Sequence, residues 1–244
     1  MQRSYFILFL VLSLSANAQW KLTPYLGSNL STVRFIDPAI DDNSLDDKPL
    51  FSGIELGVLA SYQWQDKWQL TTGLALSQRG YKAKFSESND EVSLKSETEL
   101  SLTYFEVPVL ISHKIWQNQK HELHVHGGFY AGIGATGHFS SFNSITTENE
   151  NTVTTEEERA ELGVTFVQSI NPSNFRQLSQ NQFFAQKLRA GLNTGVHYHY
   201  NQWGIRLSYL LQLTNIHSPI KPEEAALFQV RTDKLSTVQI AVSY

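Results

Sequence analysis

Four histidines are spaced so that they could act together. His124 and His126 stand two residues apart in one segment of alternating apolar and polar residues, and His197 and His199 do so in another. Because alternate residues of a β-strand point to the same face, each pair lies on one side of its strand. If the two strands pair antiparallel, the four imidazoles converge, and such a group could bind zinc, nickel or copper. The spacing thus raises the hypothesis of a metal site.

A stack of hydrogen-bonded side chains explains the same histidines without a metal. Ser112, Lys114 and Arg206 lie on the polar faces of other alternating segments and could supply the hydrogen-bond partners. We prefer this interpretation, and we predict neither a bound metal nor a resident cofactor. The chain has no cysteine, which excludes a thiolate metal site, a disulfide framework and a cysteine nucleophile.

Charged residues occupy the polar faces of these segments at mid-strand. The predicted inward-facing set is Lys21, Glu55, Arg79, Glu106, Lys114, Lys187, Arg189 and Arg206. Buried charges persist only when they are paired, so this set predicts an internal ion-pair network. The network itself is assigned to Glu55, Arg79, Glu106, Lys114, Arg189 and Arg206. Its predicted role is a structural plug, and the alternative is a gated pore or proton path.

Eight segments show the period of two that indicates a β-strand. They cover residues 19–30, 51–64, 67–82, 102–116, 121–136, 187–200, 202–214 and 237–244. In the second segment Ile54, Leu56 and Val58 share one face, whereas Glu55 and Gln63 share the other. Strands with one apolar and one polar face form the wall of a barrel, and these strands must position the histidines and charges.

The connections between the strands alternate between short and long. Polar links of a few residues precede the third, fifth and seventh strands, and the long connections are residues 36–50, 85–99, 137–186 and 215–236. The five tryptophans stand at strand ends: Trp20, Trp64, Trp68, Trp116 and Trp203. Both features are typical of outer-membrane barrels. We therefore predict an all-β fold, an eight-stranded antiparallel up-and-down transmembrane β-barrel over residues 19–244 with four long extracellular loops.

A targeting segment and the placement of charges agree with a membrane location. Residues 1–18 read as a cleaved signal peptide, with Arg3 before an apolar stretch and Ala16 and Ala18 at the cleavage site. A soluble barrel would turn its apolar face inward, but charges on the opposite face suit a polar lumen. The predicted location is the bacterial outer membrane, with outer-membrane lipid and the barrel-assembly machinery as partners.

Several blocks of the sequence resemble the PorT-like outer-membrane β-barrel domain family. The likeness lies in residues 25–31, 53–80, 104–110, 206–209 and 213–216. Its most specific parts are the Tyr-x-Glu-x-Pro stretch from Tyr104 to Pro108 and the Arg-x-x-Tyr stretch from Arg206 to Tyr209, which runs on to Thr-Asn-Ile. The resemblance implies an eight-stranded barrel in the outer membrane. Most members have no assigned activity, and the namesake takes part in protein secretion.

The function expected from these features is a structural or partner-binding role in the cell envelope, with a link to protein secretion through the resemblance. The alternatives are a narrow channel or small-ligand carrier, and a loop-based outer-membrane enzyme using His138, His217, Asp37 or Asp233. No nucleophile-elbow or zinc-protease motif is present, so we predict no enzymatic activity. With 19 basic against 23 acidic residues the chain is too acidic to bind nucleic acid, and other envelope proteins are the expected partners.

Overall fold

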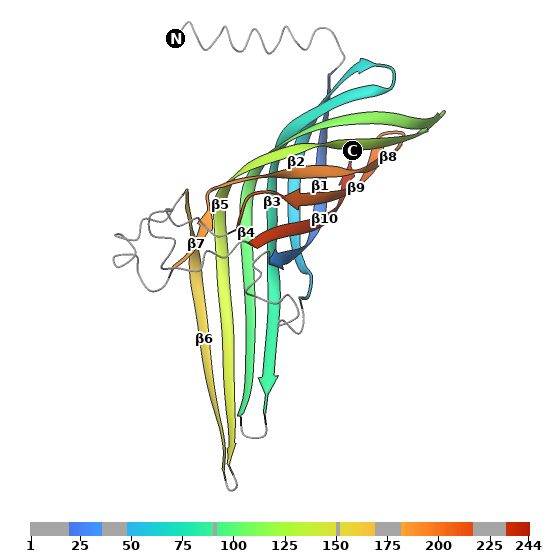
Figure 1. The fold of residues 1–244 in the computed structure, drawn as a ribbon. Helices are drawn as coiled ribbons and strands as arrows, with labels where there is room; N and C mark the ends of the chain where they lie inside the picture. The colour runs from blue at the N-terminus through green and yellow to red at the C-terminus, as the bar shows by residue number, and fades with distance from the viewer. Residues whose placement is uncertain (1–19, 36–47, 90–91, 150–151, 169–181, 217–232) are drawn as a thin grey trace, which may run out of the picture.

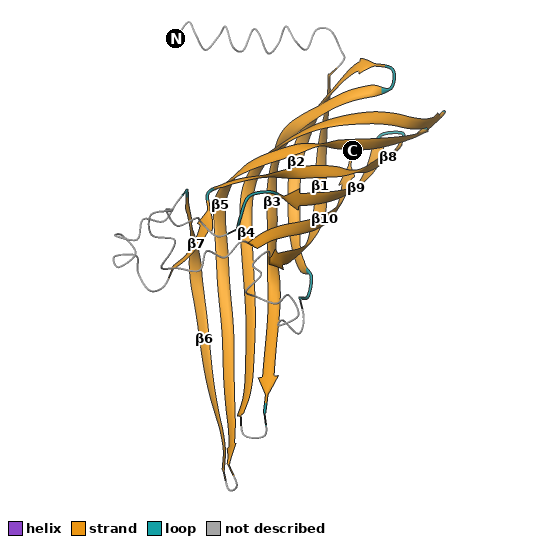
Figure 2. Ribbon diagram, in the orientation of Figure 1, coloured by secondary structure: helices purple, strands orange, loops and turns teal. Residues whose placement is uncertain are grey.

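The strands of this protein close into a ring. The computed structural model describes residues 20–35, 48–89, 92–149, 152–168, 182–216 and 233–244, which are nearly all in strands (Figures 1 and 2). The ten strands within these ranges are β1 (Trp20–Phe35), β2 (Phe51–Gln65), β3 (Trp68–Ser88), β4 (Val92–Asn118), β5 (His121–Asn149), β6 (Thr152–Val167), β7 (Gln182–Gln186), β8 (Leu188–Tyr200), β9 (Trp203–Gln212) and β10 (Asp233–Ser243). The described residues contain no helix long and apolar enough to cross a bilayer.

Eight of these strands form the ring, in the order β1, β2, β3, β4, β5, β8, β9 and β10. Each pairs antiparallel with its neighbours, and the pairing of β1 with β10 and of β4 with β5 closes the circle. The eight ring strands correspond to the eight segments predicted from the alternation. Their tight turns lie together at one end, here called the turn end, and the opposite end is called the loop end (Figure 1).

The two remaining strands correct the prediction for the third long connection. Residues 137–186 were predicted to be a long loop, with a short helix or a strand as the expected alternatives for its part from Leu162 to Phe184. Instead, β5 continues through most of the first part and pairs with β6 from His138↔Gly163 to Asn149↔Thr152. β7 then pairs with β6 in parallel. The second expected loop, residues 85–99, is also mostly a hairpin, formed by the outer ends of β3 and β4. The first and fourth connections lie largely outside the described residues, as does the predicted signal peptide.

The outer parts of β3 to β6 form a sheet that projects beyond the ring, and we call residues 82–88, 92–99, 140–149 and 152–161 the arm. Figure 1 shows these strands running far past the loop end. In the register, Lys84 pairs with Glu97, Glu97 with Phe142 and Phe142 with Arg159, so the four share one face. Both faces of the arm carry polar residues, which explains why the arm lacks the alternating pattern used to predict the other strands.

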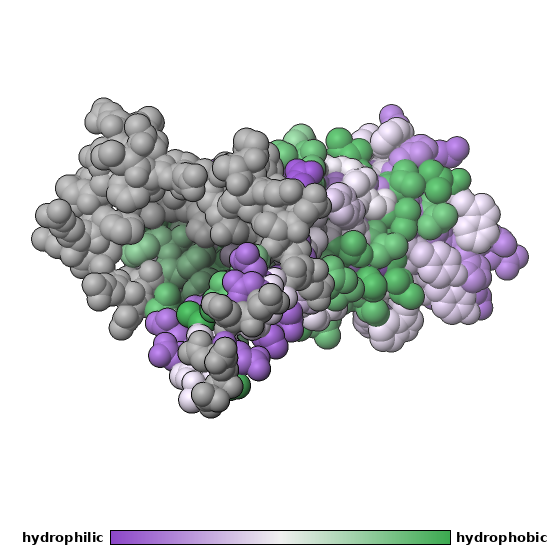
Figure 3. Space-filling model, turned by 60° about the horizontal axis from the view of Figure 1, so that its bottom comes forward, coloured by the Kyte–Doolittle hydropathy of each residue, from purple (hydrophilic) through white to green (hydrophobic). Residues whose placement is uncertain are grey.

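The outside of the ring is apolar. Leu22, Leu26, Ile54, Leu74 and Phe105 are between 60% and 70% exposed. Figure 3 shows apolar residues gathered in a band, next to paler aromatic rings and then polar residues toward the edge of the molecule. At the turn end Trp20 packs on Tyr62, Trp64 on Trp68 and Trp203 on Tyr244. An apolar band beside a belt of aromatics matches the outer surface of a membrane barrel.

Candidate functional site in the lumen

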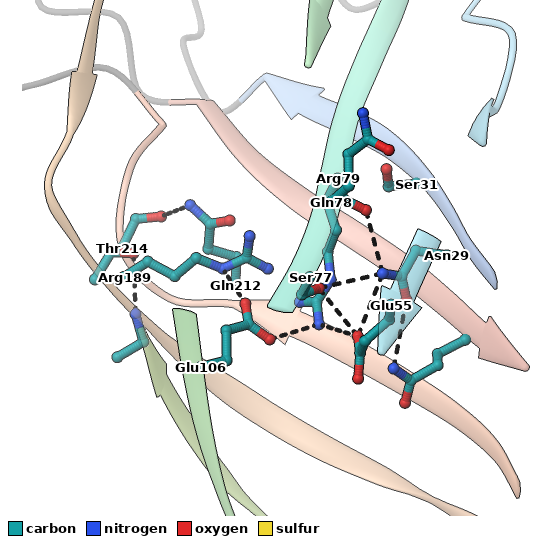
Figure 4. Close-up of polar contacts among 12 residues, drawn as sticks. Asn29, Ser31, Glu55, Ser77, Gln78, Arg79, Glu106, Arg189, Gln212 and Thr214 are labelled. Carbon is teal, nitrogen blue, oxygen red and sulfur yellow. Dashed lines mark hydrogen bonds and ion pairs between the residues drawn. The ribbon is translucent and has the colours of Figure 1, made fainter. Parts of the chain in front are cut away.

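The ring encloses a buried group of charges whose centre is Glu55. The carboxylate of Glu55 accepts a hydrogen bond from Tyr25 Oη at 2.7 Å, from Ser77 Oγ at 3.0 Å and from Asn29 Nδ2 at 3.3 Å. Arg79 Nη2 lies 3.2 Å from Glu55 Oε2. These side chains come from β1, β2 and β3, and the alternation of each strand turns them inward. Figure 4 shows Asn29, Ser77 and Arg79 grouped around Glu55. A carboxylate with four donors is well stabilised in its charged form.

Arg79 joins this group to a second carboxylate on the other side of the lumen. Its Nη2 atom lies 2.8 Å from Glu106 Oε2, and Glu106 Oε1 lies 3.2 Å from Arg189 Nε. The side chains of Arg79, Glu106 and Arg189 are no more than 3% exposed. The chain Glu55–Arg79–Glu106–Arg189 therefore links β2, β3, β4 and β8 by buried charges (Figure 4). Removing one member of such a chain leaves its neighbours unpaired in a medium of low dielectric.

Aromatic rings cover the guanidinium groups of the lumen. Arg189 lies 4.7 Å from the ring centre of Tyr104 and 5.2 Å from that of Tyr130, and Arg79 lies 5.2 Å from the same Tyr130 ring. Arg206, on β9, lies 4.5 Å from the ring centre of Tyr25. A tyrosine face attracts a cation most strongly when water is excluded, so the rings help to hold these arginines inside the ring.

The four histidines lie between this network and the turn end. The register pairs His124 with His197, and the ring centres of His124 and His199 are 5.5 Å apart. Their hydrogen bonds differ from the predicted ones: His126 Nε2 lies 3.1 Å from Ser208 Oγ, and His124 Nε2 lies 3.2 Å from Glu122 Oε2. Within the described residues no three histidine or acidic side chains are placed to hold a metal ion.

Three of the predicted inward-facing lysines lie away from the central network. Lys114 belongs to the turn-end mouth, where its Nζ is 3.4 Å from Glu122 Oε1. Lys21 lines the same mouth. Lys187 is exposed in the link between β7 and β8 and takes no part in the buried network.

Glu122 is the second residue of β5 and lines the turn-end mouth. Its carboxylate contacts both His124 Nε2, at 3.2 Å, and Lys114 Nζ, at 3.4 Å. The residue was missed in the sequence because it stands beside a predicted turn. The signal that could have identified Glu122 is its spacing of two residues from His124, which places the two side chains on the same face of the strand.

The loop-end half of the lumen is filled by apolar side chains. A cluster at most 3% exposed joins residues of β1, β3, β4, β7 and β10 with Ile216, which follows β9; its members are Val33, Tyr81, Leu100, Leu102, Tyr104, Ala185, Ile216 and Leu235. β6 and β7 complete it, since Phe166 packs edge-on against Tyr104 at 5.4 Å and Phe139 stacks on Phe183 at 4.7 Å. Gly134 permits this packing, because a Cβ there would collide with the Phe166 ring. The described residues therefore close the lumen at the loop end.

An eight-stranded ring with an apolar outside and a charged inside has the barrel-like fold of outer-membrane proteins. The family model for the outer membrane protein beta-barrel domain matches residues 15–218. The chain belongs to this family, and it is an outer-membrane protein. A search of curated proteins found no match.

Solved structures of outer-membrane proteins are similar to the chain at low identity. The attachment invasion locus protein Ail of Yersinia pestis is 12% identical, with a TM-score of 0.36, over 91% of this chain and 96% of that one. Neisserial surface protein A is 8% identical, with a TM-score of 0.35, over 92% and 97%. The N-terminal beta-barrel domain of OprF of Pseudomonas aeruginosa is 10% identical, with a TM-score of 0.26, over 90% and 97%. Likeness at this level carries no information on function.

Proposed function

We propose that this protein is an integral outer-membrane β-barrel whose eight ring strands run up and down across the bilayer, and that it serves a structural or partner-binding role in the cell envelope. In this proposal a signal peptide over residues 1–18 directs export, the barrel-assembly machinery inserts the ring, and the loop end faces outward. The family membership and the apolar outer band support insertion. The proposal includes no enzymatic activity. Of the loop-borne candidates, His138 lies within β5, and Asp37 and His217 lie outside the described residues.

The arm is the observation that carries the partner-binding role. Its outward face has Lys82 bonded to Glu99 and Lys84 bonded to Glu97, each at 3.1 Å and each with both side chains about half exposed. Arg159 lies over the Phe142 ring at 5.0 Å on the same face. A sheet that extends past the apolar band contributes nothing to crossing the membrane. Ordered strands that present charge to the outside fit a surface for binding other envelope components.

The closed lumen supports this role over that of a channel. The buried network and the apolar cluster both lie across the interior of the ring, and the side chains of an eight-stranded barrel suffice to fill it. A link to protein secretion, as in PorT-like proteins, is the finer form of the proposal. It is supported by the sequence blocks at Tyr104–Pro108 and Arg206–Tyr209, which lie on β4 and β9 of the ring.

A shortened arm tests the proposal. Because Phe142 pairs with Arg159, residues 143–158 can be removed and the two strands joined by an Asn-Gly turn without changing the register. A photo-crosslinking residue at Lys84 then reports contacts of the remaining arm in living cells, and one at Lys67, in a turn-end link, serves as the control. We expect crosslinks to envelope components from Lys84 in the wild type that the shortened variant loses.

Two results would count against the role. One is that the crosslinks from Lys84 are the same in both proteins, while heat-modified mobility on gels shows that both have folded. The other is a steady ion conductance of the wild type in planar bilayers, which would favour the channel. Because the chain has no cysteine, a single Glu157→Cys variant also tests the orientation, since an impermeant maleimide should label it on intact cells and should not label Lys67→Cys.

A further inference from the structure

The buried charges at the centre of the lumen do not balance. The described residues place three guanidinium groups there, those of Arg79, Arg189 and Arg206, but only two carboxylates, those of Glu55 and Glu106. All five residues are at most 6% exposed. An excess positive charge in such a setting is unfavourable unless an opposite charge neutralises it.

The hydrogen bonds show the same excess of donors. Arg79 uses only Nη2 for its two carboxylates, and its Nε and Nη1 atoms have no hydrogen-bond partner within the described residues. The Nε atom of Arg206 is in the same situation. Both oxygens of Glu55 and Oε2 of Glu106 already accept hydrogen bonds. Among the residues around this point, the atoms without a hydrogen-bond partner are three cationic N–H groups of Arg79 and Arg206, the amide oxygen of Asn193, and Glu106 Oε1, which lies 3.2 Å from Arg189 Nε. The cationic donors outnumber the acceptors, and this excess suits an anion.

A small cavity lies where these donors meet. It has a volume of about 10 Å³, and the polar residues of its lining are Tyr25, Glu55, Arg79, Glu106, Tyr130, Asn193 and Arg206, so both glutamates border it beside two of the three arginines. A cavity of this size holds one water-sized species. Asn193 is 5% exposed and Arg79 is fully buried, so the site is formed by ordered side chains on β8 and β3 and not by a mobile surface.

Two further cavities lie between this site and the turn end. The central cavity shares Arg206 with one of about 30 Å³, which the histidines line. That cavity shares Lys21 and His199 with the turn-end mouth, whose volume is about 270 Å³. The mouth contains four lysines and two acidic residues, namely Lys21, Lys67, Lys114, Lys120, Asp66 and Glu122. A basic entrance concentrates anions and repels cations.

We propose that the centre of the lumen is a binding site for one small monovalent anion of the size of chloride, held between Arg79 and Arg206 and reached from the turn end. One negative charge balances the three arginines against the two glutamates, and the ion accepts hydrogen bonds from the free guanidinium N–H groups. This site is independent of the partner-binding role proposed for the arm.

Halide titration of the refolded, full-length protein in detergent micelles tests the site. Sodium chloride or bromide should raise the midpoint of thermal unfolding along a saturable curve, by roughly 5–10 °C at a hundredfold excess over the dissociation constant. Sodium gluconate at the same ionic strength supplies an anion too large for the cavity and should not. The ³⁵Cl resonance should broaden with the wild type, and bromide should give an anomalous peak between Arg79 and Arg206 in a crystal.

An Asn193→Asp variant sharpens the test, because it places a carboxylate in the cavity with almost no change of shape. We expect this variant to fold without halide and to lose both the thermal response and the ³⁵Cl broadening. Asn118→Asp makes the same substitution at an exposed end of β4 and should keep the wild-type response. The inference fails if wild-type stability is the same in chloride and gluconate, if Asn193→Asp responds to halide as the wild type does, or if the crystal shows only a water molecule.

Discussion

The two halves of the lumen are built by the same strands but filled by opposite chemistry. Toward the turn end, Ser61 bonds Thr71 at 3.0 Å, histidines bond polar neighbours, and cavities remain between the side chains. Toward the loop end, Leu100 and Leu102 are at most 1% exposed and pack with aromatic rings from β6 and β7. The charged network around Arg79 lies where the two halves meet.

The difference teaches that alternation decides which side chains face inward and does not decide whether the interior is wet or dry. Odd-numbered residues of β1 face the lumen along the whole strand, from Thr23 near the turn end to Val33 near the loop end. The loop-end half is apolar because β7 and Ile216 add further side chains to it. Its closure thus depends on segments outside the ring, whereas the turn-end half is left open to a basic mouth.

The largest effect is expected at the boundary between the halves. Arg79→Met removes the shared partner of Glu55 and Glu106 and leaves both carboxylates without it in the interior. We expect a loss of about 3–5 kcal/mol in the free energy of unfolding. Urea titration in detergent, with tryptophan fluorescence as the readout, measures the free energy of unfolding of the variant and the wild type. The control is Lys84→Met, which breaks a half-exposed pair with Glu97 and should cost less than about 1 kcal/mol. Equal losses in the two variants would contradict a buried network.

The apolar half should respond to the loss of volume. Leu102→Ala leaves a cavity in the cluster and should destabilise the protein by about 2–4 kcal/mol. In the polar half, Ser61→Ala removes one hydrogen bond beside existing cavities and should cost about 1 kcal/mol. The same urea titration compares them. If Ser61→Ala were the more damaging change, the contrast between a dry and a wet half would be wrong.

The outer surface permits a matched comparison between the ring and the arm. Leu74 and Val153 are 70% and 65% exposed, but only Leu74 lies in the apolar band. Leu74→Arg should destabilise the protein in lipid vesicles by about 2–4 kcal/mol, because it moves a charge into hydrocarbon. Val153→Arg lies on the arm, in water, and should change stability by no more than about 0.5 kcal/mol. A large cost at Val153 would mean that the arm lies in the membrane.

The smallest effect is expected at the turn-end mouth, and it depends on pH. The ionised carboxylate of Glu122 pairs with Lys114 and contacts His124. Protonation in acid removes the charge on which this pairing depends, and it leaves a neutral group like the amide of a glutamine. Glu122→Gln should therefore cost less than about 1 kcal/mol at pH 7, and the difference from wild type should disappear in acid. A difference in unfolding free energy between the variant and the wild type that grew as the pH fell would contradict a stabilising role for the ionised Glu122.

The ring strands could be predicted from the sequence because each has one apolar and one polar face. The same pattern placed Glu55, Arg79, Glu106 and Arg189 on inward faces, and the structure brings these four together. The arm could not be predicted in this way, since both of its faces carry polar residues and no alternation marks it. Lys114 was assigned to the network because the pattern gives the face of a residue and not its height in the lumen.

The sequence by itself determined that the chain is all-β, which residues face outward, and that the interior holds charges. These follow from a period of two, which is a local property of an extended backbone. Only the tertiary structure decided which charges meet, that β6 and β7 close the loop end, and that β3 to β6 continue as an arm. Those features depend on pairing between residues far apart in the chain, as when His138 meets Gly163 or Arg79 meets Glu106. Registers of this kind are fixed by the packing of the whole ring.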